Sequence, residues 1–335
     1  MQIELYKSQL ASKQRTKGRK ESMEKYSYYP EGMRLDSKEN KEYISSLAGL
    51  ERARQEGIIL EAMAILCNNS MSLHVDLGNG IRGIIPREEV IWEPSGNEVK
   101  DIAVITRVGK AVCFKVKEIR CPENGTPFCI LSRREAQREC YDCYLSHLVP
   151  GDVISSKVTH LEHFGAFVDI GCGIVSLLSI DCISVSRISH PSDRFEIGQY
   201  IRAVIKSIDR ESGRIYVTHK ELLGTWEENA GLFNVGQTVA GIVRSIEDYG
   251  IFVELTPNLA GLAEYKEGIT VGQTAAVYIK NIIRERMKIK LVLIDNYKGE
   301  KTPVSNTFIL PSEVRHIDRW RYSPEGSIKQ IETFF

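Results

Sequence analysis

Short runs of alternating apolar and polar residues, ended by glycine-rich turns, dominate the middle of the chain. Such runs are typical of strands with one buried and one exposed face. In HFGAFVDIG, residues 163–171, alternation places Ala166 and Val168 inward and Phe167 and Asp169 outward. The pattern therefore predicts an exposed phenylalanine beside an aspartate, and a strand that only supports a fold does not require this pair.

The pattern recurs and divides the chain into three similar units. PGDVISSKVTHLEHFGAFVDI (150–170) matches VGQTVAGIVRSIEDYGIFVEL (235–255) without a gap, and a weaker copy begins near residue 55. Each unit contains about five short strand signals. Five antiparallel strands in so few residues favour a small closed barrel, because closure removes exposed sheet edges.

We therefore expect a mainly β protein with three tandem five-stranded antiparallel barrels and helical linkers. The helix before the first barrel is predicted from Ser37 to about Gln55, with Tyr43, Leu47 and Leu50 on its buried face. The expected parts, in chain order, are a flexible basic segment at 1–30, the helix at 31–55, a degenerate barrel at 56–132, a helical linker at 133–147, a barrel at 148–220, a linker at 221–234, a barrel at 235–295 and an extension of unassigned fold at 296–335.

The linker helix after the first unit contains a CxxC pair. Ser132 and Glu135 predict a capping box at its start. Four residues would then share one helical face: Ala136, Cys140, Cys143 and His147. A lone CxxC lacks the second pair of ligands that a zinc site needs, so we expect packing and neither a metal nor another cofactor.

A second aromatic residue lies close to Phe167. Phe164 is three residues away, which would place it on the opposite face of a regular strand. Gly165 allows a bulge or a bend, so both rings could face one groove. Tyr249 and Phe252 repeat the pair in the third unit. The alternative is that Phe167 packs under a loop or against the next unit.

Cations are predicted on the same outward face of the second unit. Alternation in YIRAVIK and RIYVT places Arg202, Lys206, Arg214 and Tyr216 outward, and Lys157 on the first strand is a further candidate. Aromatic rings stack on nucleic-acid bases and cations neutralise phosphates, and each stacked base contributes about 1–3 kcal/mol. The outward face is therefore a candidate surface for single-stranded nucleic acid.

FGAFVDIG, YGIFVEL and IDRESGRIYVTHK resemble the S1 RNA-binding domain, an oligonucleotide-binding (OB) barrel of bacterial ribosomal protein S1 and of several RNA-decay enzymes. The resemblance covers about residues 55 to 294 and implies S1-type OB barrels. The RNA-facing positions of the family are two aromatics around the glycine, a histidine after the third strand, and an Asp and an Arg near the last two strands.

The resemblance assigns these positions in each unit. The second unit has Phe164, Phe167, Asp209 and Arg214, with Ser176 at the histidine position. The third unit has Tyr249, Phe252, Ile283 and Lys288, with Glu264 at the histidine position. The first unit has Met71 and His74 for the aromatics and Pro86 for the histidine. We therefore expect the second unit to bind RNA best and the first to serve as a scaffold or a contact for protein.

Composition adds few constraints. The formal net charge is zero, and no apolar run is long enough to cross a bilayer, so we expect a cytoplasmic protein without membrane association or a required partner chain. No GxxxxGK[ST] loop, HExxH or paired CxxC is present, so we do not expect an enzyme. The predicted function is binding of single-stranded mRNA in translation, in association with the 30S ribosomal subunit. The alternatives are a protein-interaction scaffold and an accessory RNA-decay factor.

Two terminal segments lie outside the units. SKQRTKGRK (12–20) would add non-specific affinity for phosphates. The C-terminal RWRY motif (319–322) interleaves cations and aromatics, as an RNA contact would. We favour docking of Trp320 and of Phe334 and Phe335 on the third barrel, because large aromatics are usually buried.

Overall fold

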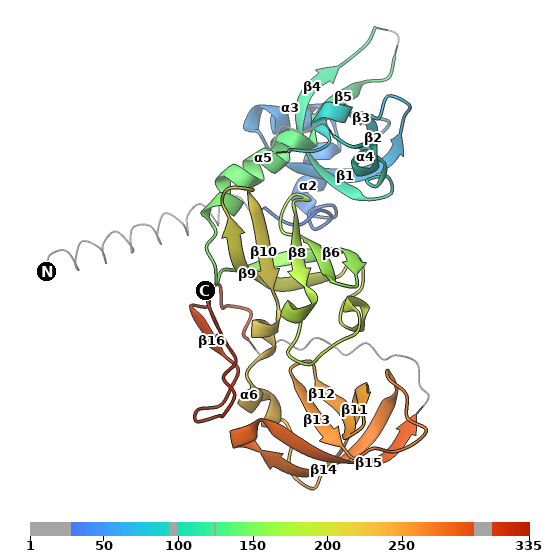
Figure 1. Ribbon diagram of the computed structural model, residues 1–335. Coiled ribbons are helices and arrows are strands. Elements are labelled where there is room, and N and C mark those ends of the chain that lie inside the picture. Colours follow the sequence, from blue (N-terminus) through green and yellow to red (C-terminus); the bar gives the residue numbers. More distant parts are fainter. Residues whose placement is uncertain (1–27, 94–98, 124, 298–309) are drawn as a thin grey trace, which may run out of the picture. The chain divides into compact units, whose positions relative to one another are not determined.

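The computed structural model describes residues 28–93, 99–123, 125–297 and 310–335, and strands are its main regular secondary structure (Figure 1). The chain divides into two compact units. The first comprises Met1–His147 and Gly171–Ile174, and the second comprises Leu148–Ile170 and Val175–Phe335. Three closed five-stranded barrels confirm the predicted fold class. The basic segment at 12–20 and most of the predicted segment at 1–30 lie outside the described residues.

The first unit contains two N-terminal helices and one barrel of strand order β1-β2-β3-β5-β4. Its helices are α2 (Lys38–Ile44), α3 (Leu47–Glu56), α4 (Asp101–Ile105) and α5 (Arg133–Cys143), with short 3-10 turns η1 (Arg87–Glu89) and η2 (Leu145–His147). Its strands are β1 (Leu60–Cys67), β2 (Leu73–Asp76), β3 (Arg82–Ile85), β4 (Ala111–Arg120) and β5 (Phe128–Ser132). Leu50 of α3 joins the apolar core of this barrel.

The prediction of a single helix from Ser37 to Gln55 was wrong in one respect: the segment forms two helices, α2 and α3. Ser46 caps α3 by accepting a hydrogen bond from the Gly49 backbone N–H. A Cβ atom at Gly49 would lie 2.3 Å from the carbonyl oxygen of Tyr43. The two helices therefore cross closely at this glycine, which a continuous helix would not allow.

At the start of helix α5 the structure confirms the N-cap half of the predicted capping box. The Ser132 hydroxyl accepts a hydrogen bond from the Glu135 backbone N–H at 2.9 Å, and the Glu135 carboxylate lies 3.4 Å from Lys117. Four residues were expected to share a packed face, and only two do. Ala136 and Cys140 are buried, whereas Cys143 and His147 are exposed; the helix ends at Cys143, so His147 lies beyond it in η2.

The second unit contains the other two barrels. The second barrel has strand order β10-β8-β7-β6-β9 and the third has β11-β12-β13-β15-β14. The strands of the second barrel are β6 (Val153–Glu162), β7 (Gly165–Asp169), β8 (Val175–Ser179), β9 (Tyr200–Asp209) and β10 (Arg214–Thr218), with 3-10 turns η3 (Ile180–Cys182), η4 (Pro191–Asp193) and η5 (Lys220–Leu223). Those of the third are β11 (Thr238–Glu247), β12 (Gly250–Thr256), β13 (Leu259–Ala263), β14 (Thr274–Ile283) and β15 (Lys288–Tyr297), with the 3-10 turn η6 (Arg284–Arg286).

The three barrels share a bulge in the first strand. Pairing of the first two strands shifts register between Ala64 and Leu66, between Val158 and His160, and between Val243 and Ser245. A bulge leaves one residue unpaired and reverses the alternation beyond it. Each first strand thereby presents a different set of side chains on the two sides of the bulge.

A short capped helix connects the second and third barrels. Thr225 and Glu228 form a reciprocal capping box at the start of α6 (Trp226–Ala230). Trp226 is buried in the core of the third barrel. No helix in the described part of the chain is long and apolar enough to span a bilayer.

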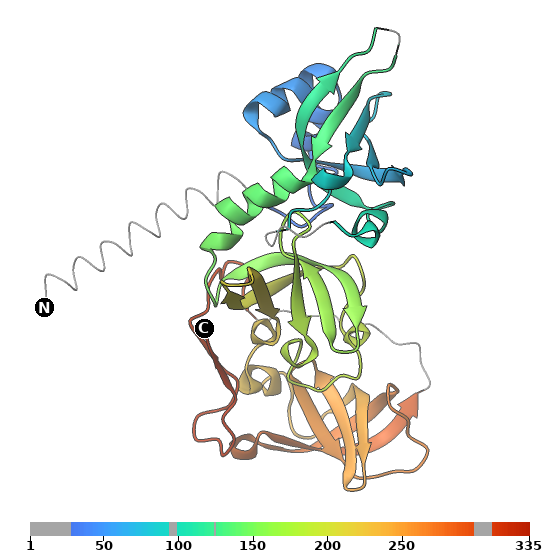
Figure 2. The same ribbon diagram turned by 45° about the horizontal axis from the view of Figure 1, so that its top comes forward.

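The C-terminal segment forms a small sheet of β16 (Arg319–Arg321) and β17 (Glu332–Phe334), seen from two directions in Figure 1 and Figure 2. Trp320 and Tyr322 pack into the core of the third barrel, as predicted for the tryptophan. The final phenylalanines behave differently. Phe335 packs beside Val153 and Val204 of the second barrel, and Phe334 is 65% exposed. The prediction for the last two residues was therefore wrong.

Candidate nucleic-acid interface

The rings of Phe164 and Phe167 meet on the outside of the second barrel. Their centroids are 6.0 Å apart and their planes are inclined by 88°. Phe164 is 55% exposed and Phe167 is half-buried. A Cβ atom at Gly165 would lie 2.5 Å from the carbonyl oxygen of Leu178 on β8. The glycine therefore lets β7 approach β8 while two aromatics flank it.

The register of the sheet places Phe167 in one outward row of five side chains. His160 of β6 and Leu177 of β8 lie directly opposite Phe167 on its two sides. Tyr216 of β10 lies beside Leu177, and Ser207 of β9 lies beside Tyr216. The ring of His160 stacks near that of Phe167 with centroids 6.4 Å apart. We call Phe164 and these five residues the second-barrel face.

Two charged residues predicted to contact RNA lie on β9 and β10, one outward position beyond Ser207 and Tyr216. Arg214 and Asp209 are paired where the hairpin begins, and both are exposed. Asp209 accepts hydrogen bonds from the Ser212 hydroxyl at 2.5 Å and from the Glu211 backbone N–H at 3.0 Å. These hydrogen bonds, chiefly from Ser212, lower the pKa of Asp209. Its immediate role is therefore to shape the turn that presents Arg214.

Lys157 lies one outward position further along β6 and β7. It is opposite Asp169, and its ammonium group lies 5.1 Å from the ring centroid of Tyr200. Tyr200 is exposed and Lys157 is only half-buried, so the ammonium group is accessible to a phosphate on this side of the second-barrel face.

Two other predicted cations lie away from this face. Arg202 donates hydrogen bonds to the carbonyl oxygens of Leu310 and Val314, at 3.1 and 2.8 Å. Lys206 is the unpaired residue at a bulge in β9 and contacts the Cys182 sulfur at 3.1 Å, which raises its pKa. The bulge reverses the alternation that placed Lys206 beside Tyr216. Ser207 occupies that position.

The aspartate expected on the exposed face is buried, and so is the glutamate that matches it in the third unit. Asp169 and Glu254 are 1% and 2% exposed. Glu254 accepts hydrogen bonds from Arg194 at 2.5 Å and from Arg244 at 2.9 Å. Burial lowers the pKa of Arg194, and the charge of Glu254 opposes this shift. Thr218 is also buried, and its hydroxyl donates to Glu221 at 2.6 Å.

The third barrel repeats the ring pair. Tyr249 and Phe252 have centroids 6.1 Å apart and an interplanar angle of 88°. A Cβ atom at Gly250 would lie 2.4 Å from the carbonyl oxygen of Ala263. The outward row that contains Phe252 is Ser245, Phe252, Leu262, Lys290 and Asn281. Exposed Lys290 takes the place of Tyr216, and Lys288 lies opposite Ile283, as Arg214 lies opposite Asp209 in the second barrel.

The residues assigned to the histidine position in the second and third units are not equivalent in the two barrels. In the third barrel Ile251 pairs with Ala263 in an antiparallel ladder. Gly250, which precedes Ile251, therefore lies opposite Glu264, which follows Ala263. The residue that pairs with Gly165 is Ser179 at the end of β8. Ser176 instead pairs with Val168, is buried, and donates to the Ile215 carbonyl at 2.6 Å. Continuing the gap-free match of the two units would have given Ser179.

The first barrel carries a different outward row. Register aligns Leu66, His74, Ile84, Ile130 and Glu118. His74 lies 3.3 Å from the Asn68 side chain, and no second ring accompanies it in the row. Leu66 and neighbouring Ile65 are 52% and 57% exposed. Three of the five side chains in this row are aliphatic, where the other two barrels present aromatic ring pairs.

Sequence reasoning missed three histidines beside the second-barrel rings and one lysine in the third barrel. His160 reaches its place through the bulge, and His163 contacts His190 edge-on with centroids 4.9 Å apart. Lys290 follows from strand pairing. The sequence HLEHFG contains a signal for two of the histidines, because they flank the ring pair.

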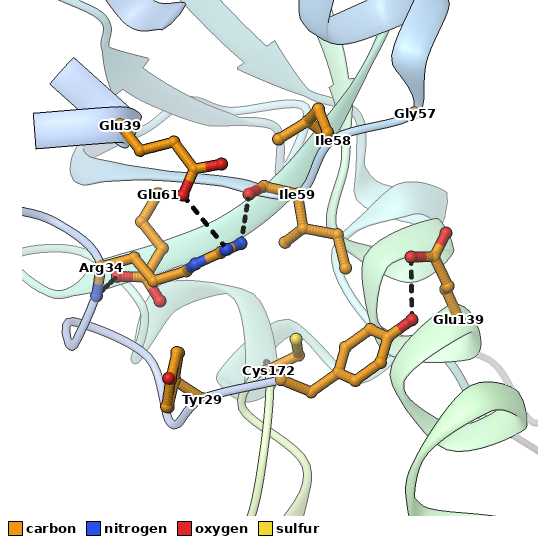
Figure 3. Close-up of a pocket in the computed structure, with 10 residues that line it drawn as sticks. Tyr29, Arg34, Glu39, Gly57, Ile58, Ile59, Glu61, Glu139 and Cys172 are labelled. Atoms are coloured by element: carbon orange, nitrogen blue, oxygen red, sulfur yellow. Dashed lines mark hydrogen bonds and ion pairs between the residues drawn. The ribbon is translucent and has the colours of Figure 1, made fainter. Parts of the chain in front are cut away.

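The residues that line one pocket in the first unit hold parts of the fold together (Figure 3). It holds about 80 Å³ and is lined by Tyr28, Tyr29, Arg34, Glu61, Glu139 and others. Glu61 accepts hydrogen bonds from the backbone N–H groups of Gly32 and Arg34, and Tyr28 donates to Glu139. These bonds tie the N-terminal segment to the barrel. No group of three potential metal ligands occurs among the described residues.

Comparison with known proteins agrees with the geometry. The family model of the S1 RNA binding domain matches residues 55–128 and 148–220. Small ribosomal subunit protein bS1 of Staphylococcus aureus (strain COL) is 33% identical over 248 residues, which cover 72% of this chain and 59% of that protein. The bS1 protein of Staphylococcus haemolyticus is 31% identical with the same coverage. The chain thus spans about three-fifths of the length of these relatives.

A solved multidomain protein with nucleic acid binding domains from Streptococcus pneumoniae covers 71% of this chain, at 16% identity and a TM-score of 0.24. The third barrel lies outside the two family-model matches, but it has the same pairing order, first-strand bulge and flanked glycine as the second. The chain is therefore a tandem S1-domain protein that resembles ribosomal protein bS1.

Proposed function

We propose that this protein is a non-catalytic single-stranded RNA-binding protein that holds mRNA in translation, in association with the small ribosomal subunit. The edge-to-face ring pair of the second barrel carries the proposal. A ring that is 55% exposed beside a second ring gives bases a stacking surface, and Arg214 and Lys157 lie where the RNA backbone would follow. Stacking uses the face that every base has, so we expect little sequence preference.

The third barrel is a second site of the same kind. Tyr249 is 70% exposed, and Lys288 and Lys290 supply charge where the second barrel has Arg214 and Tyr216. Two sites on one chain bind one strand more tightly than either alone, because the second contact becomes intramolecular. The relatives are named as small ribosomal subunit proteins, which supports the ribosomal part of the proposal.

Co-sedimentation with purified small subunits, with and without unstructured mRNA, tests this function. We expect binding that weakens as salt rises, because neutralised phosphates release counterions. Single-stranded RNA should compete, and duplex RNA should compete poorly because its bases are not free to stack. Equal competition by duplex RNA would contradict stacking as the mode of binding.

The first barrel favours a second role, contact with a protein. Three of the five side chains in its outward row are aliphatic, and Leu66 and Ile65 are more than half exposed. Exposed apolar groups of this kind mark interaction surfaces when they are contiguous. We propose that this barrel contributes to docking and not to RNA binding.

A further inference from the structure

The loop at residues 189–194 connects the ring clusters of the second and third barrels. We propose, on the basis of the proposed function above, that the two faces and this loop form one continuous track for a single RNA strand. His163 and His190 would then hold the bases between the two ring pairs. The track makes the ligand a strand long enough to span both barrels.

One end of the loop touches the ring cluster of the second barrel. The ring of His190 meets that of His163 edge-on, with centroids 4.9 Å apart and an interplanar angle of 81°. His163 directly precedes Phe164, and it is exposed. Four rings are therefore close neighbours in sequence or space: His163, His190, Phe164 and Phe167.

The other end of the loop joins the third barrel. Arg194 donates to Glu254 at 2.5 Å, and Asp193 lies 3.5 Å from Arg244. Arg194 and Glu254 side chains are 0% and 1% exposed, so this joint is a buried ion pair. Glu254 is two residues from Phe252 on β12, about 7 Å along a strand. The joint thus lies beside the ring pair of the third barrel.

Further contacts fix the two barrels against each other. The Asn258 side chain accepts from the Val185 backbone N–H at 2.9 Å and donates to the carbonyl oxygens of Lys220 and Gly224 at 2.8 and 2.9 Å. The Tyr322 hydroxyl donates to the Asn258 carbonyl at 2.5 Å. The C-terminal segment therefore reinforces the joint, and the two ring pairs are pre-organised instead of being joined by a flexible linker.

The loop itself is held by His190. Its Nδ1 accepts a hydrogen bond from the Ser192 backbone N–H at 3.1 Å, as an N-cap does for η4. Asparagine makes the same cap without offering an aromatic ring. His190→Asn therefore removes stacking and keeps the loop. Glu254→Gln weakens the joint and leaves all rings in place, and exposed Glu247→Gln is its matched control.

The test is fluorescence-anisotropy binding of the full chain to labelled mixed-sequence RNA from about 6 to about 30 nucleotides, a range set by the site size of OB barrels. We expect the affinity of the wild type to rise steeply once the strand spans both faces. His190→Asn should lose about 5-fold or more on the longest RNA, as one lost base stack predicts, and little on the shortest. Glu254→Gln should reduce the advantage of long over short RNA, and Glu247→Gln should not.

Equal affinity of the wild type and His190→Asn for the longest RNA would overturn the continuous track, even if all lengths bind. Failure of the wild type to bind RNA of any length would overturn the proposed function together with this inference. The unfolding midpoint, followed by the fluorescence of Trp226 and Trp320 in the third-barrel core, shows that a variant is folded. Neither of these two results requires the Glu254→Gln variant, so they hold even if that variant does not fold.

Discussion

Phe164 and Phe167 meet edge to face with ring centroids 6.0 Å apart, on either side of a glycine that leaves no room for a side chain. The Cβ position of Gly165 lies 2.5 Å from the Leu178 carbonyl oxygen, which belongs to the backbone and cannot rotate away. The ring pair therefore depends on close approach of β7 and β8. Tyr249 and Phe252 repeat this dependence at Gly250.

We predict that Gly165→Ala separates β7 from β8. Overpacking of this kind costs about 1–3 kcal/mol of unfolding free energy. The ring geometry should change with it, so affinity for single-stranded RNA should fall as well. Thermal unfolding and RNA binding of the same preparation measure both effects. An unchanged melting temperature with unchanged affinity would show that the glycine is not required.

Much of this architecture was predictable because the repeat is visible in the sequence. The gap-free match of 150–170 with 235–255 and the alternation of Ala166 and Val168 define the strands of two barrels and their inward faces. The break between α2 and α3 was not predictable, because it depends on the close crossing at Gly49. Helical periodicity continues across Ser45 and Ser46 in the sequence but not in the fold.

The site was harder to predict than the fold because bulges and tertiary contacts decide it. The bulge in β9 moves Lys206 away from Tyr216, and the bulge in β6 brings His160 to Phe167. Alternation alone places neither residue correctly. Glu254 faces outward from its own barrel, yet Arg194 from the preceding barrel buries it. The repeat cannot reveal such a partner, because the contact joins two copies.

The buried pair of Glu254 and Arg194 should be costly to break on one side. Glu254→Gln removes the carboxylate charge that pairs with buried Arg194, while Arg244 keeps Asp193, and a broken buried pair typically destabilises by about 3–5 kcal/mol. Exposed Glu247→Gln should change stability by less than about 0.5 kcal/mol. Urea unfolding at neutral pH compares the two. Equal midpoints for the two variants would refute the role of the pair.

Stability should depend on pH through His219. Burial lowers its pKa to about 4, and its Nδ1–H donates to the Arg202 carbonyl oxygen at 2.8 Å. The folded protein therefore keeps this imidazole neutral, whereas the unfolded chain binds a proton below about pH 6.5. Stability should fall as the pH is lowered from about 6.5 to about 4, by up to about 3 kcal/mol from this group.

His219→Asn retains a donor for the Arg202 carbonyl and removes the titrating group. Its unfolding midpoint should change less between pH 7 and pH 5 than that of the wild type. The comparison cancels the other groups that titrate in this range. A wild type and a variant with the same pH dependence would show that His219 is not a source of acid sensitivity.

Substitutions in the first barrel should affect docking to the small subunit and leave RNA binding unchanged. His74→Ala should change RNA affinity by less than about 2-fold, because His74 is half-buried and no second ring accompanies it in its row. Leu66→Lys places a charge on the aliphatic row where the side chain is 52% exposed, so folding should be retained. Co-sedimentation with small subunits should weaken in Leu66→Lys without loss of RNA affinity. Loss of RNA affinity in either variant would contradict this division.

The most direct test of the account is the affinity of Phe164→Ala/Phe167→Ala for labelled single-stranded RNA, measured by fluorescence anisotropy across a salt series. Phe334→Ala is the matched control, because this ring is 65% exposed and lies over Arg319 in the C-terminal sheet. We predict that the double variant loses about 2–6 kcal/mol of binding free energy, two base stacks, and that the control binds like the wild type. The salt dependence should persist in both, because the cations remain. Equal affinity of the double variant and the wild type would contradict the claim that this ring pair binds RNA.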